Sequence, residues 1–367
     1  MNYYCIRLKE DNVRYSKPSI TKTGHNEMTK QRESNFELLR IIAMFMVLAL
    51  HANFFAIGKG VDLADFHSSP LSASIRLLIE MMSIVSINVF VMISGWFGIK
   101  PSARSFGNFV FQCLFFLVGI YVIALLSGTV PLSLKGVASC LTLTSGYNWF
   151  IRAYLGLYVL SPILNAFLEH CSKRQLEYVL ISFYTFQTIY GFIANVDFFC
   201  SGYSTFSFIG LYLLSRYLRL YGMAVYKFGG AIYLVSVLVN MLFYIIFIVF
   251  DIQQIHTTSY VDPLVVTGAA GLIIWIAQLS INTSRLINFI ASSSFTVYLL
   301  HQNPTICDIT FRPLMKSIYE HFNGPVCLAV EFVVLVLIYA LAVLLDQPRK
   351  WIWNCLWKKF EKFFRRV

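Results

Sequence analysis

The chain has 367 residues, of which 57% are hydrophobic and only 13% carry a charged side chain. Soluble domains usually contain about 25% charged residues, so this composition excludes an ordinary soluble protein. Apolar runs such as FVVLVLIYALAVLL (residues 332–345) approach the roughly 20 residues with which a helix crosses a bilayer. The sequence therefore predicts an all-α polytopic membrane protein rather than a β-barrel, whose strands would alternate in hydrophobicity.

Residues 1–34 are polar and basic, and they lack the apolar core and the cleavage site of a signal peptide. We expect a disordered cytoplasmic tail here, with Met28 as an alternative start. A transmembrane domain is predicted over residues 35–347. The basic and aromatic residues 348–367 are typical of a helix that lies on the anionic cytoplasmic surface of a membrane.

About ten apolar segments are predicted to cross the membrane, separated by turn-forming residues such as Asn323-Gly324-Pro325. They cover residues 36–57, 73–97, 106–127, 147–166, 176–195, 203–219, 228–250, 263–281, 287–306 and 325–346.

The distribution of Lys and Arg predicts the orientation of these spans. With the N-terminus inside, 23 of the 29 Lys and Arg residues fall in inner segments and four fall in outer loops. Both termini are therefore expected in the cytoplasm. This bias also accounts for the net charge of +11 without a nucleic-acid partner, because the basic residues flank membrane-embedded segments.

The first span, residues 36–57, contains two cationic side-chain types in an apolar run, Arg40 and His51. Eleven residues of α-helix rise about 16 Å and turn about 20° past three full turns, so both residues lie on one stripe with Met44 and Val47. Arg40 can extend to the inner headgroups. An ionisable residue at the depth of His51 is a functional candidate, with an interhelical hydrogen bond as the structural alternative.

Four later stretches accompany the Arg40–His51 pair, in a fixed order. They are INVFVMISGWF (87–97), NWFIRAYLGLYVLSPIL (148–164), SFTVYLLHQNP (294–304) and LLDQPRKW (344–351). Together the five features resemble the membrane-bound acyltransferase 3 family over about residues 34–357.

The resemblance implies an enzyme of the cytoplasmic membrane, an O-acyltransferase that acts in polysaccharide biosynthesis. It would transfer an acyl group, most often acetyl, from cytoplasmic acyl-CoA to a hydroxyl of a cell-surface or lipid-linked glycan. His51 suits this chemistry as a general base, because an imidazole accepts protons near working pH. It could instead carry the acyl group itself, and the sequence leaves both mechanisms open.

The phosphates of acetyl-CoA require cations on the inner side, and Lys100, Arg104 and Arg40 are the predicted ligands. The family often has an RxxR pair at the start of the third span. Here the segment KPSARSF (100–106) keeps the charge but not the spacing.

Other polar residues of the spans complete the predicted site. We expect Arg40 to contribute to catalysis and one carboxylate, Glu80 or Glu331, to orient His51. Structural ion pairs or interhelical hydrogen bonds are the alternative for these carboxylates. The residues predicted to contact the acceptor are Asn148, Trp149, Arg152 and His301.

Several other functions lack their sequence signatures. The chain has no GxSxG, Walker A or HExxH motif and no cysteine pairs with metal-ligand spacing, so we expect no metal. Membrane lipids are the other expected partners. A transporter or flippase of a lipid-linked glycan is the main alternative function, since it would also combine many spans with buried polar residues.

Overall fold

The structure is a computed structural model that describes residues 33–144, 148–252 and 257–364. The chain divides into residues 1–31 and a helical unit of residues 32–367, and the fold below is that of the described part of this unit. Helices are the only regular secondary structure among the described residues, which confirms the all-α prediction. The predicted N-terminal tail lies outside the described residues, except for its last two positions.

The helices follow one another with short connections. The first group is α1 (Ser34–Leu50), the π-helix η1 (His51–Ala56), α2 (Leu63–Ser68), α3 (Pro70–Ser83), α4 (Ser86–Phe97), α5 (Ala103–Leu126), α6 (Leu134–Leu141), α7 (Trp149–His170) and α8 (Lys173–Phe186). The second group is η2 (Gln187–Ile193), η3 (Cys200–Gly202), α9 (Thr205–Tyr221), η4 (Gly222–Phe228), α10 (Gly229–Val249) and α11 (Pro263–Ala277). The third group is α12 (Arg285–Ala291), α13 (Ser294–His301), α14 (Pro304–Ile306), η5 (Cys307–Phe311), α15 (Arg312–His321) and α16 (Gly324–Phe364).

Six segments of the described chain are long and apolar enough to cross a membrane as helices. They are Ser34–Ala56, Pro70–Phe97, Ala103–Leu126, Trp149–His170, Thr205–Val249 and Gly324–Lys362. The fifth segment contains two predicted spans, and α11 is a shorter apolar helix. The structure therefore describes a multi-pass membrane protein, while the count of ten spans stays a prediction.

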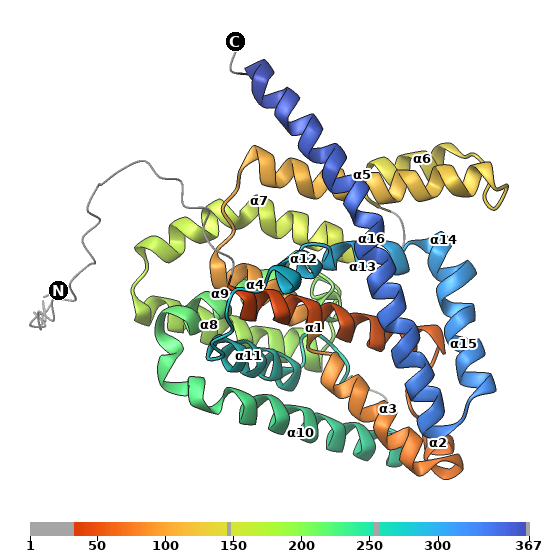
Figure 1. The fold of residues 1–367 in the computed structure, drawn as a ribbon. Helices are drawn as coiled ribbons and strands as arrows, with labels where there is room; N and C mark the ends of the chain where they lie inside the picture. Colours follow the sequence, from red (N-terminus) through yellow and green to blue (C-terminus); the bar gives the residue numbers. More distant parts are fainter. Residues whose placement is uncertain (1–32, 145–147, 253–256, 365–367) are drawn as a thin grey trace, which may run out of the picture. The chain divides into compact units, whose positions relative to one another are not determined.

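Helix α1 lies among the other helices and packs against α3, α4, α11, α12, α13 and α16 (Figure 1). Its residues Met44 and Val47, which share the stripe of Arg40 and His51, are buried at 3% and 1% exposure. Because this stripe of α1 faces other helices, its last residue, His51, lies inside the helical unit rather than against lipid.

The segments predicted to lie on the inner side of the membrane meet at one end of the unit. Near the start of α1, Phe36 packs against Trp96 of α4, with ring centroids 5.2 Å apart. The Trp96 carbonyl accepts a 2.6 Å hydrogen bond from Arg219 of α9. In α16, Lys350 donates to the Ser292 hydroxyl at the end of α12. These contacts define a basic end of the unit, whose orientation in the membrane stays a prediction.

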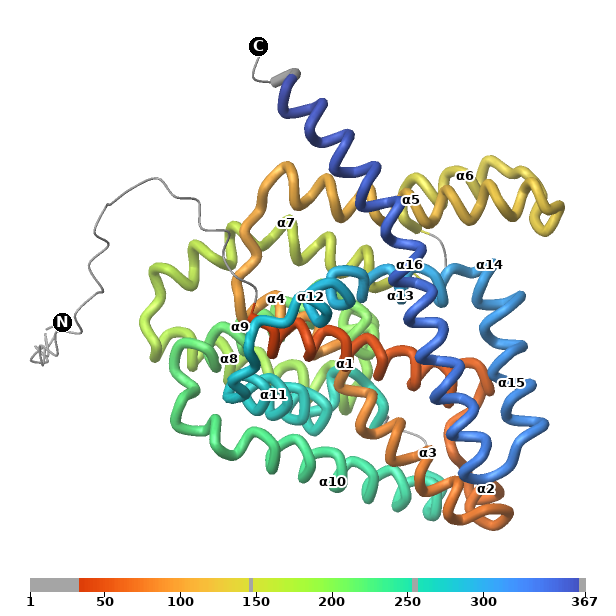
Figure 2. Tube along the Cα trace, in the orientation of Figure 1, coloured from red at the N-terminus to blue at the C-terminus, as the bar shows by residue number. Residues whose placement is uncertain are grey.

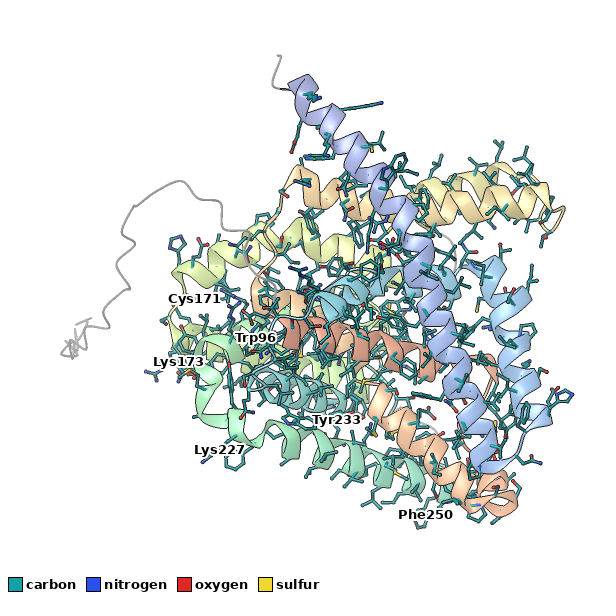
Figure 3. The ribbon with its side chains drawn as sticks, in the orientation of Figure 1. Trp96, Cys171, Lys173, Lys227, Tyr233 and Phe250 are labelled. Carbon is teal, nitrogen blue, oxygen red and sulfur yellow. The ribbon has the colours of Figure 1, made fainter. Side chains whose placement is uncertain are left out.

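Helix α10 also runs from the basic end of the unit to the opposite end. In Figure 3, Lys173 and Lys227 lie at the end of the unit where Trp96 is also found, whereas Phe250 lies at the far end of α10. Helix α10 has 21 residues, or about 31 Å, which matches the thickness of a hydrocarbon core.

The predicted ninth span, residues 287–306, is a broken helix rather than a continuous one. Helix α12 ends before Ser292, α13 ends at His301, and α14 is a single short turn (Figure 2). Ser293 and Asn303 precede the restarts, and the Asn303 side chain accepts from the backbone N–H of Thr305 at 3.1 Å. Interrupted helices occur at membrane depth where they are buried in protein or line a cavity.

The last predicted span and the basic C-terminal segment form one helix, and the place of this segment on the membrane surface stays a prediction. Helix α16 continues for 41 residues through Pro348 and runs as one rod in Figure 2. Arg349 and Lys350 both pair with Asp346, at 2.9 and 3.3 Å, and these pairs bridge the turn that contains the proline. At about 1.5 Å per residue, α16 is roughly twice as long as a hydrocarbon core is thick, so part of it extends beyond that core.

Helices α10 and α11 cross closely because glycines face each other. A Cβ atom on Gly271 would lie 2.7 Å from the Tyr233 backbone nitrogen and 2.9 Å from the Gly229 carbonyl oxygen. Backbone atoms cannot move aside as a flexible side chain can. Small residues at such crossings let membrane helices approach and pack.

Gly271→Ala is therefore expected to destabilise the protein by about 1–3 kcal/mol, the usual cost of overpacking. The matched control is Gly119→Ala in α5, where a Cβ atom would meet nothing within 4 Å. Thermal unfolding of the purified variants, followed by tryptophan fluorescence, would measure the difference. Equal midpoints for the two variants would contradict the close crossing.

Candidate active site

The side chain of His51 is held by the end of the broken ninth span. His51 Nδ1 lies 2.8 Å from His301 Nε2 and 2.7 Å from the Gln302 side-chain amide. His51 begins η1, a π-helical turn that widens the end of α1. Such turns are frequent at functional sites. Two residues 250 positions apart thus form one histidine pair.

The backbone carbonyl of Val297 determines how the protons of this pair are placed. His301 Nδ1 lies 2.6 Å from that oxygen, which only accepts, so Nδ1 carries the hydrogen. Because His301 is 2% exposed, its neutral form is favoured over a buried cation, and its Nε2 is then an acceptor. His51 Nδ1 then donates to it. The Gln302 atom placed 2.7 Å from Nδ1 is the amide nitrogen, so this tautomer requires the amide to be flipped, with its oxygen toward the same hydrogen.

This tautomer leaves the lone pair of His51 on Nε2, on the opposite side of the ring. His51 also forms part of the wall of a cavity of about 360 Å³. The rings of Trp149, Tyr203 and Tyr260 form an aromatic cluster in the same wall, with centroids 4.4–5.9 Å apart. Such rings offer apolar faces together with polar edges, which suits an amphipathic ligand.

Glu80 of α3 also lines the cavity of His51. The residue is 2% exposed, and its Oε1 has no hydrogen-bond partner within the described residues. A buried carboxylate oxygen is unfavourable without a partner. The position of Glu80 therefore suits a group that accepts a hydrogen bond from a bound ligand.

The predicted orientation of His51 by a carboxylate differs from the observed contacts. His301 and Gln302 occupy the Nδ1 side of the ring, which leaves no room for a carboxylate there. Glu331 instead accepts a 2.6 Å hydrogen bond from Asn53 and lines another cavity. Catalytic roles for Glu80 and Glu331 stay predictions.

The four residues predicted to contact an acceptor occupy different places. Trp149 lines the cavity of His51, and Asn148 is buried next to it at the start of α7. Arg152 is exposed and is not part of the wall. His301 lies behind His51 rather than at a cavity mouth, because its ring is buried against Phe311 and Tyr298.

The three predicted acyl-CoA ligands lie at the basic end of the unit. Arg40 is one turn past Phe36, and its Nε lies 3.7 Å from Glu37. Lys100 and Arg104 are exposed where α4 passes into α5, and the Arg104 guanidinium lies 6.0 Å from the ring centroid of Trp357. All three are thus accessible from the same end, but their binding role stays a prediction.

Several cavity residues were not found from the sequence. Tyr203, Ser259 and Tyr260 lie in connections between helices, where no periodic pattern marks them. Gln302 directly follows His301, and this was the only feature of the sequence that pointed to Gln302 as a residue of the site. In the described residues, no group of three or more His, Cys, Asp or Glu side chains is arranged to hold a metal ion.

Together, the fold and the site define a multi-pass helical membrane protein with a histidine at an aromatic cavity. One family model, described as an acyltransferase domain, matches residues 33–345. The chain therefore belongs to the acyltransferase 3 family, which confirms the resemblance noted in the sequence. No curated protein and no solved structure matches the chain. Family membership supports a membrane acyltransferase.

Proposed function

We propose that the protein transfers an acyl group, most often acetyl, from cytoplasmic acyl-CoA to a hydroxyl of a cell-surface or lipid-linked glycan at the cytoplasmic membrane. The observation that carries this proposal is the His51–His301 pair. Its hydrogen bonds favour the tautomer that keeps the lone pair on His51 Nε2, and His51 lines an aromatic cavity together with Glu80.

As a general base, His51 Nε2 takes the proton of the sugar hydroxyl while the hydroxyl oxygen attacks the thioester carbonyl. The carbon–sulfur bond then breaks, and the imidazolium returns the proton to the leaving thiolate of CoA. His301 Nε2 accepts the Nδ1 hydrogen throughout, which stabilises the positive charge on His51. Glu80 accepts a hydrogen bond from a neighbouring sugar hydroxyl and orients the acceptor.

As an acyl carrier, His51 Nε2 would attack the thioester itself and release the CoA thiolate. His301 is then placed to take the Nδ1 proton of the acylated ring. In a second step the oxygen of the sugar hydroxyl would attack the acyl carbon, and the bond between that carbon and Nε2 would break. His301 would return its proton to Nδ1, and the proton of the hydroxyl would neutralise the CoA thiolate. Both mechanisms use the same tautomer and the same histidine pair.

The direct test uses the purified protein in membrane nanodiscs with acetyl-CoA and oligosaccharides prepared from the cell-surface polysaccharide of the source cell. Release of free CoA is measured with a thiol reagent, and the products are analysed by mass spectrometry. We expect CoA release only when oligosaccharide is present, together with a product that has gained one acetyl group. Glycan movement without CoA release would instead indicate a flippase.

The double variant Lys100→Ala/Arg104→Ala is expected to raise the KM for acyl-CoA about tenfold. A charge-assisted hydrogen bond contributes about 1.5–3 kcal/mol, and the exposure of both side chains favours the lower end. The matched control, Lys135→Ala/Lys316→Ala, removes the same charge from exposed positions in predicted outer loops. Initial rates at varied acyl-CoA measure the effect. Equal KM values in the two double variants would show that Lys100 and Arg104 do not bind acyl-CoA and only help to orient the protein in the membrane.

A further inference from the structure

A second polar cavity lies on the other side of η1. Its volume is about 470 Å³, and its wall includes Asn53, Asp65, Arg76, Tyr319 and Glu331. It shares no lining residue with the cavity of His51. Residues that are two positions apart in a helix point in roughly opposite directions. His51 and Asn53 therefore face opposite sides of η1. One turn of helix therefore separates the two cavities, which we call the His51 cavity and the Arg76 cavity.

Arg76 is fixed in the wall of the Arg76 cavity by contacts from three directions. Its Nη1 donates to the Tyr319 hydroxyl at 3.2 Å, and its Nη2 donates to the Asn53 carbonyl at 3.3 Å. The guanidinium carbon lies 4.8 Å from the centroid of the Tyr319 ring. A guanidinium held on two sides and stacked on a ring has one orientation, as a binding group requires.

The Nε–H group of Arg76 is a further donor. The residue is 5% exposed, and its Nε has no hydrogen-bond partner within the described residues. A buried donor without a partner is unfavourable, and more so when the group is charged. Arg76 lines the cavity, so a polar ligand there can supply an acceptor to the guanidinium group.

The charges around the cavity indicate the class of this ligand. Asp65 lies 3.9 Å from Arg76 and 3.4 Å from Lys59 at the rim. Lys59 also donates to Asp62, and this hydrogen bond lowers the pKa of Asp62. Among the wall residues themselves there are one cation, Arg76, and two carboxylates, Asp65 and Glu331, so the cavity has no positive excess to select an anion. Arg76 itself disfavours a bound cation.

The remaining polar groups of the wall are hydroxyls and amides, including Ser68, Ser69, Ser72 and Asn323. Neutral hydroxyl groups can donate to the carboxylates and accept from Arg76 and the amides. Tyr319 adds an aromatic edge to the same wall. This combination of groups suits a neutral polyhydroxylated molecule.

We propose that the Arg76 cavity binds a neutral saccharide unit of the acceptor glycan, at a distance along the glycan from the unit that reacts in the His51 cavity. This inference rests on the proposed transfer to a glycan. It adds a second subsite on the other side of η1, so that acceptors of three or more units, which are long enough to reach both cavities, are used better than a single unit.

The test measures kcat/KM for acetyl transfer to neutral oligosaccharides of one to four units, prepared by partial hydrolysis of the source cell's polysaccharide. The readout is the ratio of kcat/KM for the preferred oligomer to that for the monosaccharide. Wild-type protein is expected to show a ratio of about ten or more, which corresponds to one charge-assisted hydrogen bond.

Two variants change the Arg76 cavity in different ways. Arg76→Gln removes the guanidinium, and Ser72→Trp fills the cavity without removing any contact of Arg76. Both are expected to reduce the ratio to about one. Ser74→Trp is the matched control, because Ser74 lies on α3 outside the wall of the cavity, and it should keep the wild-type ratio. Ser72→Trp decides the test where Arg76→Gln does not fold.

Three results would overturn the proposal. A wild-type ratio near one, or a high ratio kept in Ser72→Trp, would show that no saccharide unit binds in the Arg76 cavity while transfer itself is intact. A preference for uronic acid oligosaccharides over neutral ones that is lost in Arg76→Gln would make the cavity an anion site. Absence of transfer to every saccharide would instead refute the proposed function on which this inference rests.

Discussion

His51→Asn is expected to reduce acyl transfer by about 10²–10⁴-fold, the usual effect of losing a general acid or base. The asparagine amide reaches the place of His51 Nδ1, so it can still donate a hydrogen bond to His301. It has no nitrogen at the place of Nε2, where the structure leaves the lone pair. The substitution therefore removes the proposed base and keeps the contact that holds η1 against the end of α13.

Steady-state transfer rates at saturating acyl-CoA, normalised to correctly folded protein, measure this effect. The matched control is His170→Asn, which makes the same change at an exposed position at the end of α7 and should keep the wild-type rate. A His51→Asn protein that is folded and transfers acyl groups at nearly the wild-type rate would exclude His51 as base and as acyl carrier.

Helical periodicity was enough to predict the setting of His51. Apolar composition identified the first span, and the eleven-residue spacing placed Arg40 and His51 on one face. The structure keeps α1 regular as far as Leu50, and the intervening Met44 and Val47 are buried. These features follow from local geometry within a single helix, which a sequence specifies directly.

The partner of His51 could not be predicted in the same way. His301 lies 250 residues away, and spacing within a helix carries no information about such a contact. The expected carboxylate partner rested on charge alone, whereas Glu331 faces Asn53 on the other side of η1. The breaks in the ninth span fall at Ser292-Ser293-Ser294 and at Gln302-Asn303-Pro304. Short polar runs of this kind also occur in continuous helices, so the predicted span did not include the breaks.

Aromatic residues of the His51 cavity illustrate the same limit. Trp149 belongs to a predicted span and was found, but Tyr203 and Tyr260 lie in connections whose paths depend on tertiary contacts. The backbone N–H of Tyr260 donates to the Ser201 carbonyl at 3.1 Å, which joins two loops distant in sequence. A sequence pattern does not report such loop-to-loop contacts.

His301→Leu is expected to reduce kcat by about 10²-fold, since a displacement of a reacting group by about 1 Å can have an effect of this size. Leucine fills much of the buried space but cannot accept the hydrogen from His51 Nδ1. His51 would then lose the contact that fixes its tautomer and its ring orientation. His301 touches no reacting atom in this mechanism, so it is a positioning residue, and the KM values for both substrates should change little.

His301→Gln distinguishes this positioning role from a merely structural one. The glutamine amide oxygen reaches the place of His301 Nε2 and accepts the same hydrogen. The kcat of the glutamine variant should therefore be at least tenfold higher than that of the leucine variant. A structural histidine would give a different result, with both variants less stable and each folded molecule still active at the wild-type rate. Because kcat is measured per folded molecule, equal values for the leucine and glutamine variants would show that the hydrogen bond to His51 does not position the base.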